Sequence, residues 1–471
     1  MVFPIVGGDG KPTGYDVENS LRFNASDSPQ LSKDMSSISA TSTKKFTTSF
    51  WLKPGNVPQT SYGGIIDVGG DHAISLVSDN TLYFFENGGS DLYWRPTRVF
   101  RDPGAWYNII IIADSTLSTQ TDRVKIYVNG VIETSFHNNS GPNQNHDFAF
   151  NTVNTRYIGR KQSTSSSLDG YLTEIHHIDG QAKAHTDFGE FDDNGVWVPI
   201  EYTGTYGNTG YYLEFKQTGT SQNSSGIGAD TSGNDNHFAV SNFAALDVTE
   251  DTCTNNFATL NSLDQGLGNA AISEGNCKFV GADGDTCRAR STLAVANGKW
   301  YAEFRVANNH KLRISVTDNV GMETNGPLTN DGVDFGINDG YLYTYKDGTN
   351  NDTGAGSVSG GIDLSYTHSS NDIIGVALDA DNNTVRFYVN GSAQGSEATV
   401  LQRSTTANAI HFFSMYDFSG SGNNANTVEC NFGNPSFSIS SGNNDGKYGN
   451  FEYAPPSGYY ALCTKRLGSF G

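Results

Sequence analysis

The stretch VKIYVNG at residues 124–130 returns almost unchanged as VRFYVNG at residues 385–391, 261 positions later (385 − 124). In both copies, apolar side chains occupy every second position, which is the period of a half-buried β-strand. Each copy ends in Asn-Gly, the pair that most readily adopts the positive φ angles of a two-residue hairpin turn. The pattern predicts that each copy is one arm of a β-hairpin.

The residues before each copy also match. AWYNIIIIAD at 105–114 and NDIIGVALDAD at 371–381 are apolar strands that a polar loop joins to the hairpin. The repeated element is therefore a supersecondary unit. Two interpretations remain: the chain holds two domains of similar architecture, or an antiparallel protein reuses a stable hairpin.

The composition is that of a β protein with many turns. A length of 471 residues exceeds one ordinary core and favours two or three domains. The 54 glycines, with Ser, Thr and Asn, dominate between the apolar runs, as expected for short strands with tight connections. We therefore expect an all-β fold with two antiparallel β-sandwich domains of jelly-roll type in tandem, long loops and little helix.

The net charge argues against several classes of partner, and the cysteine count bears on disulfide bonding. A formal net charge of −21 repels phosphate backbones and anionic lipids, so we expect neither nucleic-acid binding nor membrane insertion. The longest strongly apolar run, residues 109–113, is too short to cross a bilayer, and the first residues lack a signal-peptide pattern. Five cysteines without a CxxC pair predict buried free thiols, with a Cys277–Cys287 disulfide as the alternative for an extracellular protein.

Changes in composition along the chain indicate its domain organisation. The irregular, acidic and glycine-rich stretch at residues 189–210 is the best boundary after the first sandwich. The two prolines of YAPPSGYYALC (453–463) argue against a central strand near the C-terminus. We expect an N-terminal arm that serves in docking (1–16), a first sandwich (17–200), a bridging segment that could add strands to the second domain (201–255), a second sandwich (256–435) and a loop-rich C-terminal tail (436–471).

Five pieces of the first half carry a family resemblance, namely SLRFN (20–24), FTTSFWLKPGN (46–56), RDPGAWYNIIIIAD (101–114), KIYVNG (125–130) and LDGYLTEIHHIDGQAKAHTDFGEFDDNGVWVPIEY (168–202). They resemble the concanavalin A-like lectin/glucanase (laminin-G-like) modules of marine tailed-phage proteins. The last piece is the most specific, because an acidic tail after the final strand is a recurrent feature of the phage versions. The resemblance implies a concanavalin A-like fold for the first sandwich.

The second half is similar to a SPRY-type sandwich through ANGKWYAEFRV (296–306) and NDIIGVALDADNNTVRFYVNG (371–391). The pieces ADTSGNDNHFAV (229–240) and TCTNNFATLN (252–261) resemble the bridge of such phage chains, and MVFPIVGGDGKPTG (1–14) resembles their leader. The resemblance implies a phage structural protein with a concanavalin A-like domain followed by a SPRY-like domain. Within the leader, Val2, Phe3 and Pro4 are the expected docking residues for a capsid or tail partner.

The sequence lacks the motifs of the common hydrolytic enzymes. The glucanases of this fold carry their paired carboxylates on one strand as Glu-x-Asp-x-Glu, or with one more residue, so that period two points them to one face. Glu190 and Asp192 match the first two positions, but Asn194 and Gly195 stand where the second glutamate would fall. Neither a GxSxG elbow nor a local Cys-His signature is present. We therefore expect a protein that is not an enzyme.

Three histidines form only a weak zinc pattern. His176 and His177 are adjacent, so on a strand they point to opposite faces and cannot both bind one metal ion. His185 does not complete the set. The default interpretation is surface or hydrogen-bonded histidines.

Calcium has more support, because laminin-G-like sandwiches often hold one ion at a loop rim. Asp67 and Asp71 in DVGGDH (67–72) are the candidate ligands. DADNNT (379–384) begins like an EF-hand loop, but Thr384 stands where glycine is needed, so a plain hairpin loop is favoured. We expect that no cofactor is required, with Ca²⁺ as the one candidate ion.

Tyr93, Trp94 and Arg95 are the candidate glycan-binding residues. They lie together in DLYWRPTRVFRD (91–102), and aromatic faces bind the C–H faces of pyranose rings. The alternative interpretation is that Trp94 packs in the core.

These observations and the resemblance lead to one functional expectation. We expect a non-enzymatic virion structural protein of a tailed phage, assembled in the host cytoplasm and displayed on the capsid or tail as a decoration or fibre protein. Its expected partners are other virion proteins, a host-surface glycan and further copies of itself as a homo-oligomer. A secreted carbohydrate-binding lectin is the alternative, and a glycoside hydrolase is disfavoured.

Overall fold

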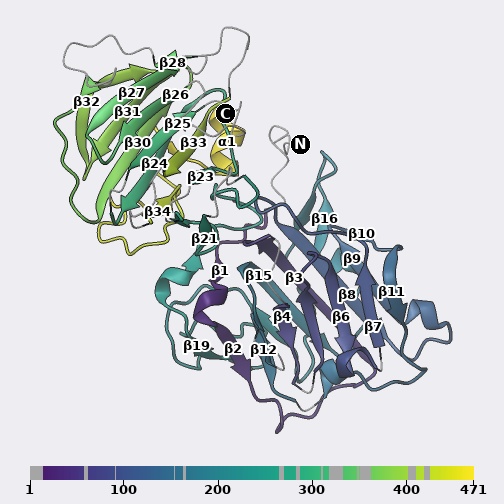
Figure 1. Cartoon of the computed structure of the whole chain (residues 1–471). Helices are drawn as coiled ribbons and strands as arrows, with labels where there is room; N and C mark the ends of the chain where they lie inside the picture. The colour runs from purple at the N-terminus through teal and green to yellow at the C-terminus, as the bar shows by residue number, and fades with distance from the viewer. Residues whose placement is uncertain are drawn as a thin grey trace. The chain divides into compact units, whose positions relative to one another are not determined.

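The computed structural model describes residues 14–57, 62–69, 71–90, 92–152, 154–162, 166–264, 270–282, 287–308, 311–317, 332–346, 349–350, 362–400, 410–417 and 425–471. The expected docking residues Val2, Phe3 and Pro4 lie outside these ranges. The described residues up to Asn256 form one compact unit, and Phe257–Gly471 form another (Figure 1). Both units are built almost entirely from antiparallel β-strands, as the composition predicts.

The first unit contains two large sheets and a small hairpin. The eight-stranded sheet runs in the order β10 (Val131–Ile132), β9 (Val124–Val128), β8 (Tyr107–Asp114), β3 (Lys45–Pro54), β15 (Gly170–Asp179), β1 (Ser20–Phe23) and β20 (Val248–Thr249), with β18 (Tyr211–Leu213) also paired to β15. The ten-stranded sheet runs in the order β11 (Phe136–Ser140), β7 (Leu92–Pro96), β6 (Leu82–Glu86), β5 (Ala73–Leu76), β4 (Gly63–Asp67), β12 (Arg156–Ile158), β2 (Gln30–Lys33) and β19 (Ala239–Ser241), with β13 (Arg160–Lys161) and β14 (Ser166–Ser167) beside this path. The hairpin consists of β16 (Gly189–Phe191) and β17 (Trp197–Pro199).

The second unit also contains two sheets. The eight-stranded sheet runs in the order β21 (Ala271–Ser273), β22 (Lys278–Val280), β34 (Thr427–Asn431), β24 (Lys299–Val306), β30 (Asp372–Asp379), β31 (Thr384–Val389) and β32 (Ser392–Thr399), with β35 (Tyr460–Ala461) paired to β24. The seven-stranded sheet runs in the order β23 (Cys287–Arg290), β33 (Phe412–Asp417), β25 (Leu312–Thr317), β26 (Gly332–Gly336), β27 (Tyr341–Lys346) and β28 (Thr349–Asn350), with β29 (Ile362–Asp363) paired to β27.

Helix is scarce in the described part of the chain. One α-helix, α1 (Thr464–Phe470), lies near the C-terminus. The remaining helical turns are short 3₁₀ segments, namely η1 (Ala25–Asp27), η2 (Asn87–Gly89), η3 (Gln120–Asp122), η4 (Ala149–Asn151), η6 (His185–Asp187) and η7 (Ala245–Asp247).

The two large sheets of the first unit pack face to face around one hydrophobic core. Phe46 of β3 meets Phe84 of β6 edge to face, with ring centroids 6.2 Å apart. Side chains alternate along β3, so Phe46 and Phe50 enter this core while Trp51 points to the opposite face. On that opposite face, a second apolar cluster including Trp51 and Trp197 covers the eight-stranded sheet. This double burial explains why nearly every residue of β3 is buried.

The twin hairpins occupy matching places in the two units. β9 pairs with β8 and β10, and β31 pairs with β30 and β32. In both turns the Asn and Gly have positive φ, at 47° and 73° for Asn129 and Gly130 and at 49° and 77° for Asn390 and Gly391. The prediction from the opening repeat is therefore confirmed at the level of backbone angles.

Each turn asparagine also ties the turn to the preceding strand. The N–H of Asn129 donates to the carbonyl of Asn108 at 2.9 Å, and the Asn129 Oδ1 accepts the N–H of Asn108 at 2.7 Å. Asn390 makes the same two bonds with Ile373, both at 2.9 Å. The asparagine of each YVNG motif thus hydrogen-bonds the turn to the preceding strand.

The segments between and after the expected sandwiches have definite places. Within residues 201–255, β18, β19 and β20 all join sheets of the first unit, and none joins the second. The C-terminal residues 436–471 pack on the second unit, where β35 pairs in parallel with β24. The loop at 380–383 joins β30 to β31 as a plain hairpin.

Candidate functional site

The period of a β-strand separates the three candidate glycan residues. On β7, Trp94 faces the core between the sheets and is only 4% exposed, while Tyr93 and Arg95 on either side of it are half-buried on the outer face. Trp94 packs against Phe84 with ring centroids 6.5 Å apart. The three side chains therefore do not form one platform, and Trp94 packs in the core as the alternative interpretation states.

The outer face around Tyr93 carries an ordered set of aromatic and polar side chains. Strand register places the buried Phe85 opposite Tyr93, and Tyr83 lies near enough to Arg95 for the guanidinium charge to act on its hydroxyl. The rings of Tyr83 and Phe85 stack at 4.6 Å. We call these four residues, Tyr83, Phe85, Tyr93 and Arg95, the outer tyrosine face.

Short polar side chains flank the outer tyrosine face on both neighbouring strands. Ser75 of β5, opposite Tyr83, is fully buried, while Asn138 and Ser140 of β11 lie opposite Arg95 and Tyr93. Asn138 and Ser140 are exposed. The face thus combines aromatic rings with amide and hydroxyl groups at its edge.

Arg95 is held in place by two partners. Its Nε donates to Thr81 Oγ1 at 2.9 Å, and its Nη2 forms a close ion pair with Asp79. Partial burial opposes ionisation of Asp79, but hydrogen bonds from Thr81 and the Arg95 charge lower the pKa of that carboxyl. Because the ion pair is about half exposed, its role is to orient the guanidinium beside Tyr83 rather than to stabilise the fold.

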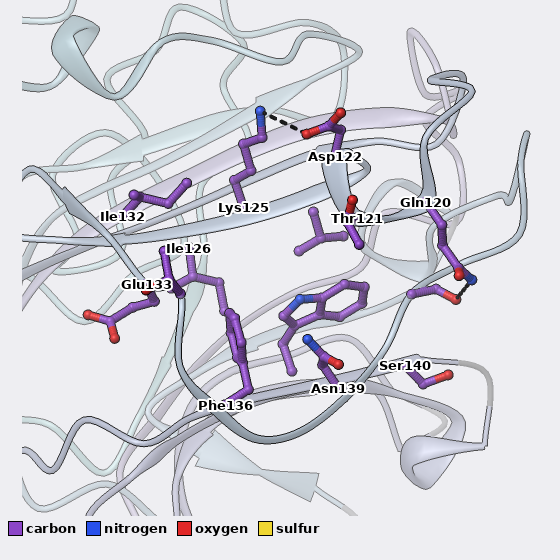
Figure 2. A pocket seen from close by; sticks show the side chains of 14 residues that line it. Gln120, Thr121, Asp122, Lys125, Ile126, Ile132, Glu133, Phe136, Asn139 and Ser140 are labelled. Carbon is purple, nitrogen blue, oxygen red and sulfur yellow. Dashed lines mark hydrogen bonds and ion pairs between the residues drawn. The ribbon is translucent and has the colours of Figure 1, made fainter.

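A pocket of about 600 Å³ lies at the edge of the same sandwich, on the inner side of β7. It lies between β9 and β10 of one sheet and β7 and β11 of the other, and η3 borders it. Figure 2 shows Glu133 and Phe136 on one side of the opening and Gln120 and Ser140 on the other. Trp94 contributes to its lining. We call this cavity the edge pocket.

Comparisons with known proteins place the first unit. Residues 25–186 match the family model described as the concanavalin A-like lectin/glucanases superfamily, Laminin_G_3. This segment is similar to the concanavalin A-like domains of that family. A comparison with curated protein sequences finds no significant match.

Solved structures resemble parts of the chain at low sequence identity. The SPRY domain of human HERC1 is 18% identical with a TM-score of 0.27, and the match covers 34% of this chain and 91% of that one. The TRIM65 PSpry domain is 12% identical with a TM-score of 0.26, covering 37% and 89%. A proposed carbohydrate-binding protein from Bacteroides ovatus is 12% identical with a TM-score of 0.32, covering 48% and 58%.

The calcium candidates of the concanavalin A-like domain have other partners. Asp67 is fully buried and accepts the N–H groups of Gly69 at 2.8 Å and Gln162 at 3.3 Å, and burial raises the pKa of its carboxyl. Asp71 instead accepts a hydrogen bond from the Lys161 ammonium at 2.7 Å. Among the described residues, no group of three or more His, Cys, Asp or Glu is arranged to hold a metal ion. These two aspartates therefore do not fit a shared calcium ion.

The candidate zinc histidines of this domain are structural. His177 bonds Thr48 and Asn151, each at 2.9 Å, and burial lowers its pKa to about 3, so it is neutral. His176 points to the other face and bonds the Tyr206 hydroxyl at 2.9 Å. His185 stacks on Tyr127 with centroids 4.2 Å apart. The three histidines do not converge on one point.

The remaining sequence candidates belong neither to the outer tyrosine face nor to the lining of the edge pocket. Glu190 and Asp192 belong to the β16–β17 hairpin, where Asp192 accepts the N–H groups of Asn194 and Val196 and so shapes the turn. Cys277 and Cys287 are both buried free thiols, as are Cys430 and Cys463, and Cys253 is half-buried. In the ranges that the structure describes, no helix is long and apolar enough to span a membrane.

Sequence reasoning missed two parts of the site. Tyr83 and Phe85 join Tyr93 only through the register of β6 against β7, although the alternation in LYFFE already points both to one face. Tyr62, which is 37% exposed, lies near them, because the Lys161 ammonium contacts the rings of both Tyr62 and Phe85. The edge pocket has no local sequence signal, because its walls come from segments that meet only in the fold.

Proposed function

We propose that this protein binds carbohydrate through the outer tyrosine face of its concanavalin A-like domain and that it does so without catalysis. The observation that carries the proposal is that the half-buried side chains of Tyr83, Tyr93 and Arg95 lie together on the outer side of β6 and β7, with the buried ring of Phe85 opposite Tyr93. A sugar ring offers C–H groups to an aromatic face, whose π-electrons are negative, and hydroxyl groups to polar side chains around it. This face has both kinds of partner.

The polar groups at this face suit hydroxyl recognition. The Arg95 guanidinium is fixed by Thr81 and Asp79, so it presents its remaining N–H groups with little loss of side-chain freedom. Asn138 and Ser140 add an amide and a hydroxyl on the neighbouring strand. A preorganised set of this kind lowers the entropic cost of binding.

A glycan array tests this proposal. The full chain should bind a defined set of glycans with and without EDTA, since the site uses no metal ion. Tyr93→Ala should weaken binding about tenfold, equivalent to ~1.4 kcal/mol for one lost stacking partner. Tyr127→Ala, which removes a half-buried tyrosine from the other sheet, is the matched control and should leave binding unchanged.

Binding that survives Tyr93→Ala and Arg95→Ala would reject the outer tyrosine face as the site. No binding by the unmodified chain under either condition would reject the lectin role. Loss of binding in EDTA alone would show that an ion is required.

We further propose that the protein acts as a structural component of a tailed-phage virion, displayed on the capsid or tail. The resemblance of residues 20–200 to phage modules supports this proposal, and a net charge of −21 would keep a protein soluble at high copy number. All five cysteines are free, which suits assembly in a reducing host cytoplasm. Imaging of purified particles should locate the protein at regular positions on their surface, and its absence from particles would reject the virion role.

A further inference from the structure

The edge pocket exists because one edge of the first sandwich stays open. β10 pairs with β9 at Val128 and Tyr127, and the N–H of Glu133 adds a hydrogen bond to the carbonyl of Ile126 at 2.8 Å before the chain crosses to the other sheet to begin β11 at Phe136. The part of β9 around Val124 and Ile126 therefore borders a cavity instead of a further strand. The volume of about 600 Å³ lies in the range of small-molecule binding sites.

Hydrogen bonds fix one wall of this cavity. The Arg123 guanidinium donates to the carbonyls of Leu117, Ser118 and Pro142 at 2.8 to 2.9 Å. Gln120 donates to the carbonyl of Gly141 at 2.9 Å, a bond drawn in Figure 2. The pocket is therefore preformed rather than a gap between loosely held loops.

The charges at the pocket are already paired. Lys125 lies 3.5 Å from Asp122 (Figure 2). Glu133 accepts a hydrogen bond from Arg98 at 2.5 Å. An ionic ligand would compete with the partner already present for its counter-charge. The lining therefore favours an uncharged ligand.

Several polar groups at the pocket have no partner inside the protein. Within the described residues, the side chains of Thr121 and Asn139 make no hydrogen bond, and the indole N–H of Trp94 donates to no acceptor. Asn139 lies opposite Trp94 in the β7–β11 ladder, so both side chains project to the same inner side of the sheet. The unpaired Nε1 atom of Trp94 is not fully enclosed by protein atoms.

Trp94 is only 4% exposed, and among the described residues its indole N–H and that of Trp51, which is 5% exposed, have no acceptor. Trp106, Trp197 and Trp300 donate theirs to Asp251, Asn108 and the carbonyl of Asn297, at 3.2, 3.0 and 2.7 Å. Buried tryptophans usually find such a partner. A ligand that brings a hydroxyl oxygen to Trp94 would supply it.

We propose that the edge pocket is a second ligand site, distinct from the outer tyrosine face, and that it takes a neutral saccharide of one or two pyranose rings. The apolar surface of Phe136 and Ile132 and the accessible edge of Trp94 contact the C–H face of a ring. The hydroxyl groups of that ring accept from Trp94 Nε1 and exchange hydrogen bonds with Asn139 and Thr121. A purely apolar ligand would leave these groups unpaired, which costs affinity.

The test follows the indole ¹H–¹⁵N signals of the full chain during titration with cellobiose, maltose and lactose as neutral probes and digalacturonate as a charged probe. The Trp94 signal is assigned by its loss in Trp94→Phe. We expect at least one neutral disaccharide to shift this signal saturably. Asn139→Ala, on an exposed edge strand, should weaken that binding about tenfold, as expected for one lost hydrogen bond in a preformed site.

Tyr93→Ala separates this site from the proposed function, because it alters only the outer face. The Trp94 shift should persist in Tyr93→Ala. The inference is overturned if no neutral disaccharide shifts the Trp94 signal, if Tyr93→Ala abolishes the shift, or if digalacturonate binds more tightly than the neutral probes. Unchanged signals of Trp106 and Trp197 show that each variant is folded. If Trp94→Phe does not fold, Asn139→Ala still tests the site.

Discussion

The stability of the second unit should depend on the protonation of one buried carboxyl group, that of Glu303. This residue lies on β24, is 0% exposed, and accepts the N–H groups of Glu452 at 3.0 Å and Tyr453 at 2.8 Å from the C-terminal segment. Burial raises its pKa from 4.5 to about 7, although these hydrogen bonds oppose the rise. The tyrosine beside it, Tyr301, also has a raised pKa and stays neutral in this range.

The direction of the effect follows from the two pKa values. Because the folded state holds the proton more tightly than the unfolded state, the stabilisation is complete below about pH 4.5 and is lost as the pH rises through about 7. The interval between the values corresponds to about 3 kcal/mol of unfolding free energy. Glu303→Gln removes the titration but keeps a neutral side chain of similar size.

Urea unfolding between pH 4.5 and pH 8, followed by hydrogen exchange of peptides from the second unit, measures this effect. The unfolding free energy of Glu303→Gln minus that of the unmodified chain should increase by about 3 kcal/mol over the range. Glu397→Gln, at an exposed position on β32, is the control and should show no such trend. A difference between Glu303→Gln and the unmodified chain that is independent of pH would refute the reasoning.

Three further predictions follow from the fold. Asn129→Ala and Asn390→Ala should each destabilise their own unit by about 1–3 kcal/mol, because alanine is strained at positive φ and has no side-chain oxygen to accept the N–H of Asn108 or Ile373. Hydrogen exchange measured separately for each unit tests this, and a loss of protection in the other unit would contradict it. Lys53→Met should lower the unfolding free energy of the first unit by about 3–5 kcal/mol in urea, because it leaves Asp251 buried without the ammonium partner that lies 2.7 Å away. Adding Asp251→Leu should recover stability, and no recovery would contradict this account. Cys253 should react with a maleimide under native conditions while the four buried cysteines react only after unfolding, so five labels on the native protein, counted by mass spectrometry, would refute the assigned burial.

The twin hairpins show what the sequence could predict. Alternation and Asn-Gly define a strand and a turn locally, and both Asn129 and Asn390 adopt the expected positive φ. The expectation of two similar architectures also follows, because each hairpin sits beside a strand that the same pattern identifies. Local information was sufficient here because the paired strands are close in sequence.

The candidate glycan residues show that neighbours in sequence need not form one surface. Tyr93, Trp94 and Arg95 are neighbours in sequence, but a strand sends consecutive side chains to opposite faces, so Trp94 lines the edge pocket while the other two face outward. The alternation of Leu92, Trp94 and Pro96, all buried, carried this information. The partners Tyr83 and Phe85 required the register between strands, which no local pattern specifies.

Long-range pairing accounts for most of what could not be predicted. β18, β19 and β20 contain two or three residues each, too few for a periodic signal, and they pair with strands many residues earlier in the chain. Lys161, which bonds the calcium candidate Asp71, is likewise distant from it in sequence.

The most direct test of the central claim is a crystal structure of the chain with an oligosaccharide selected on the glycan array. The account predicts a sugar ring stacked on Tyr93 or Tyr83, with a hydroxyl group hydrogen-bonded to Arg95 or Asn138. A bound oligosaccharide found elsewhere on the protein, with the outer tyrosine face empty, would contradict it.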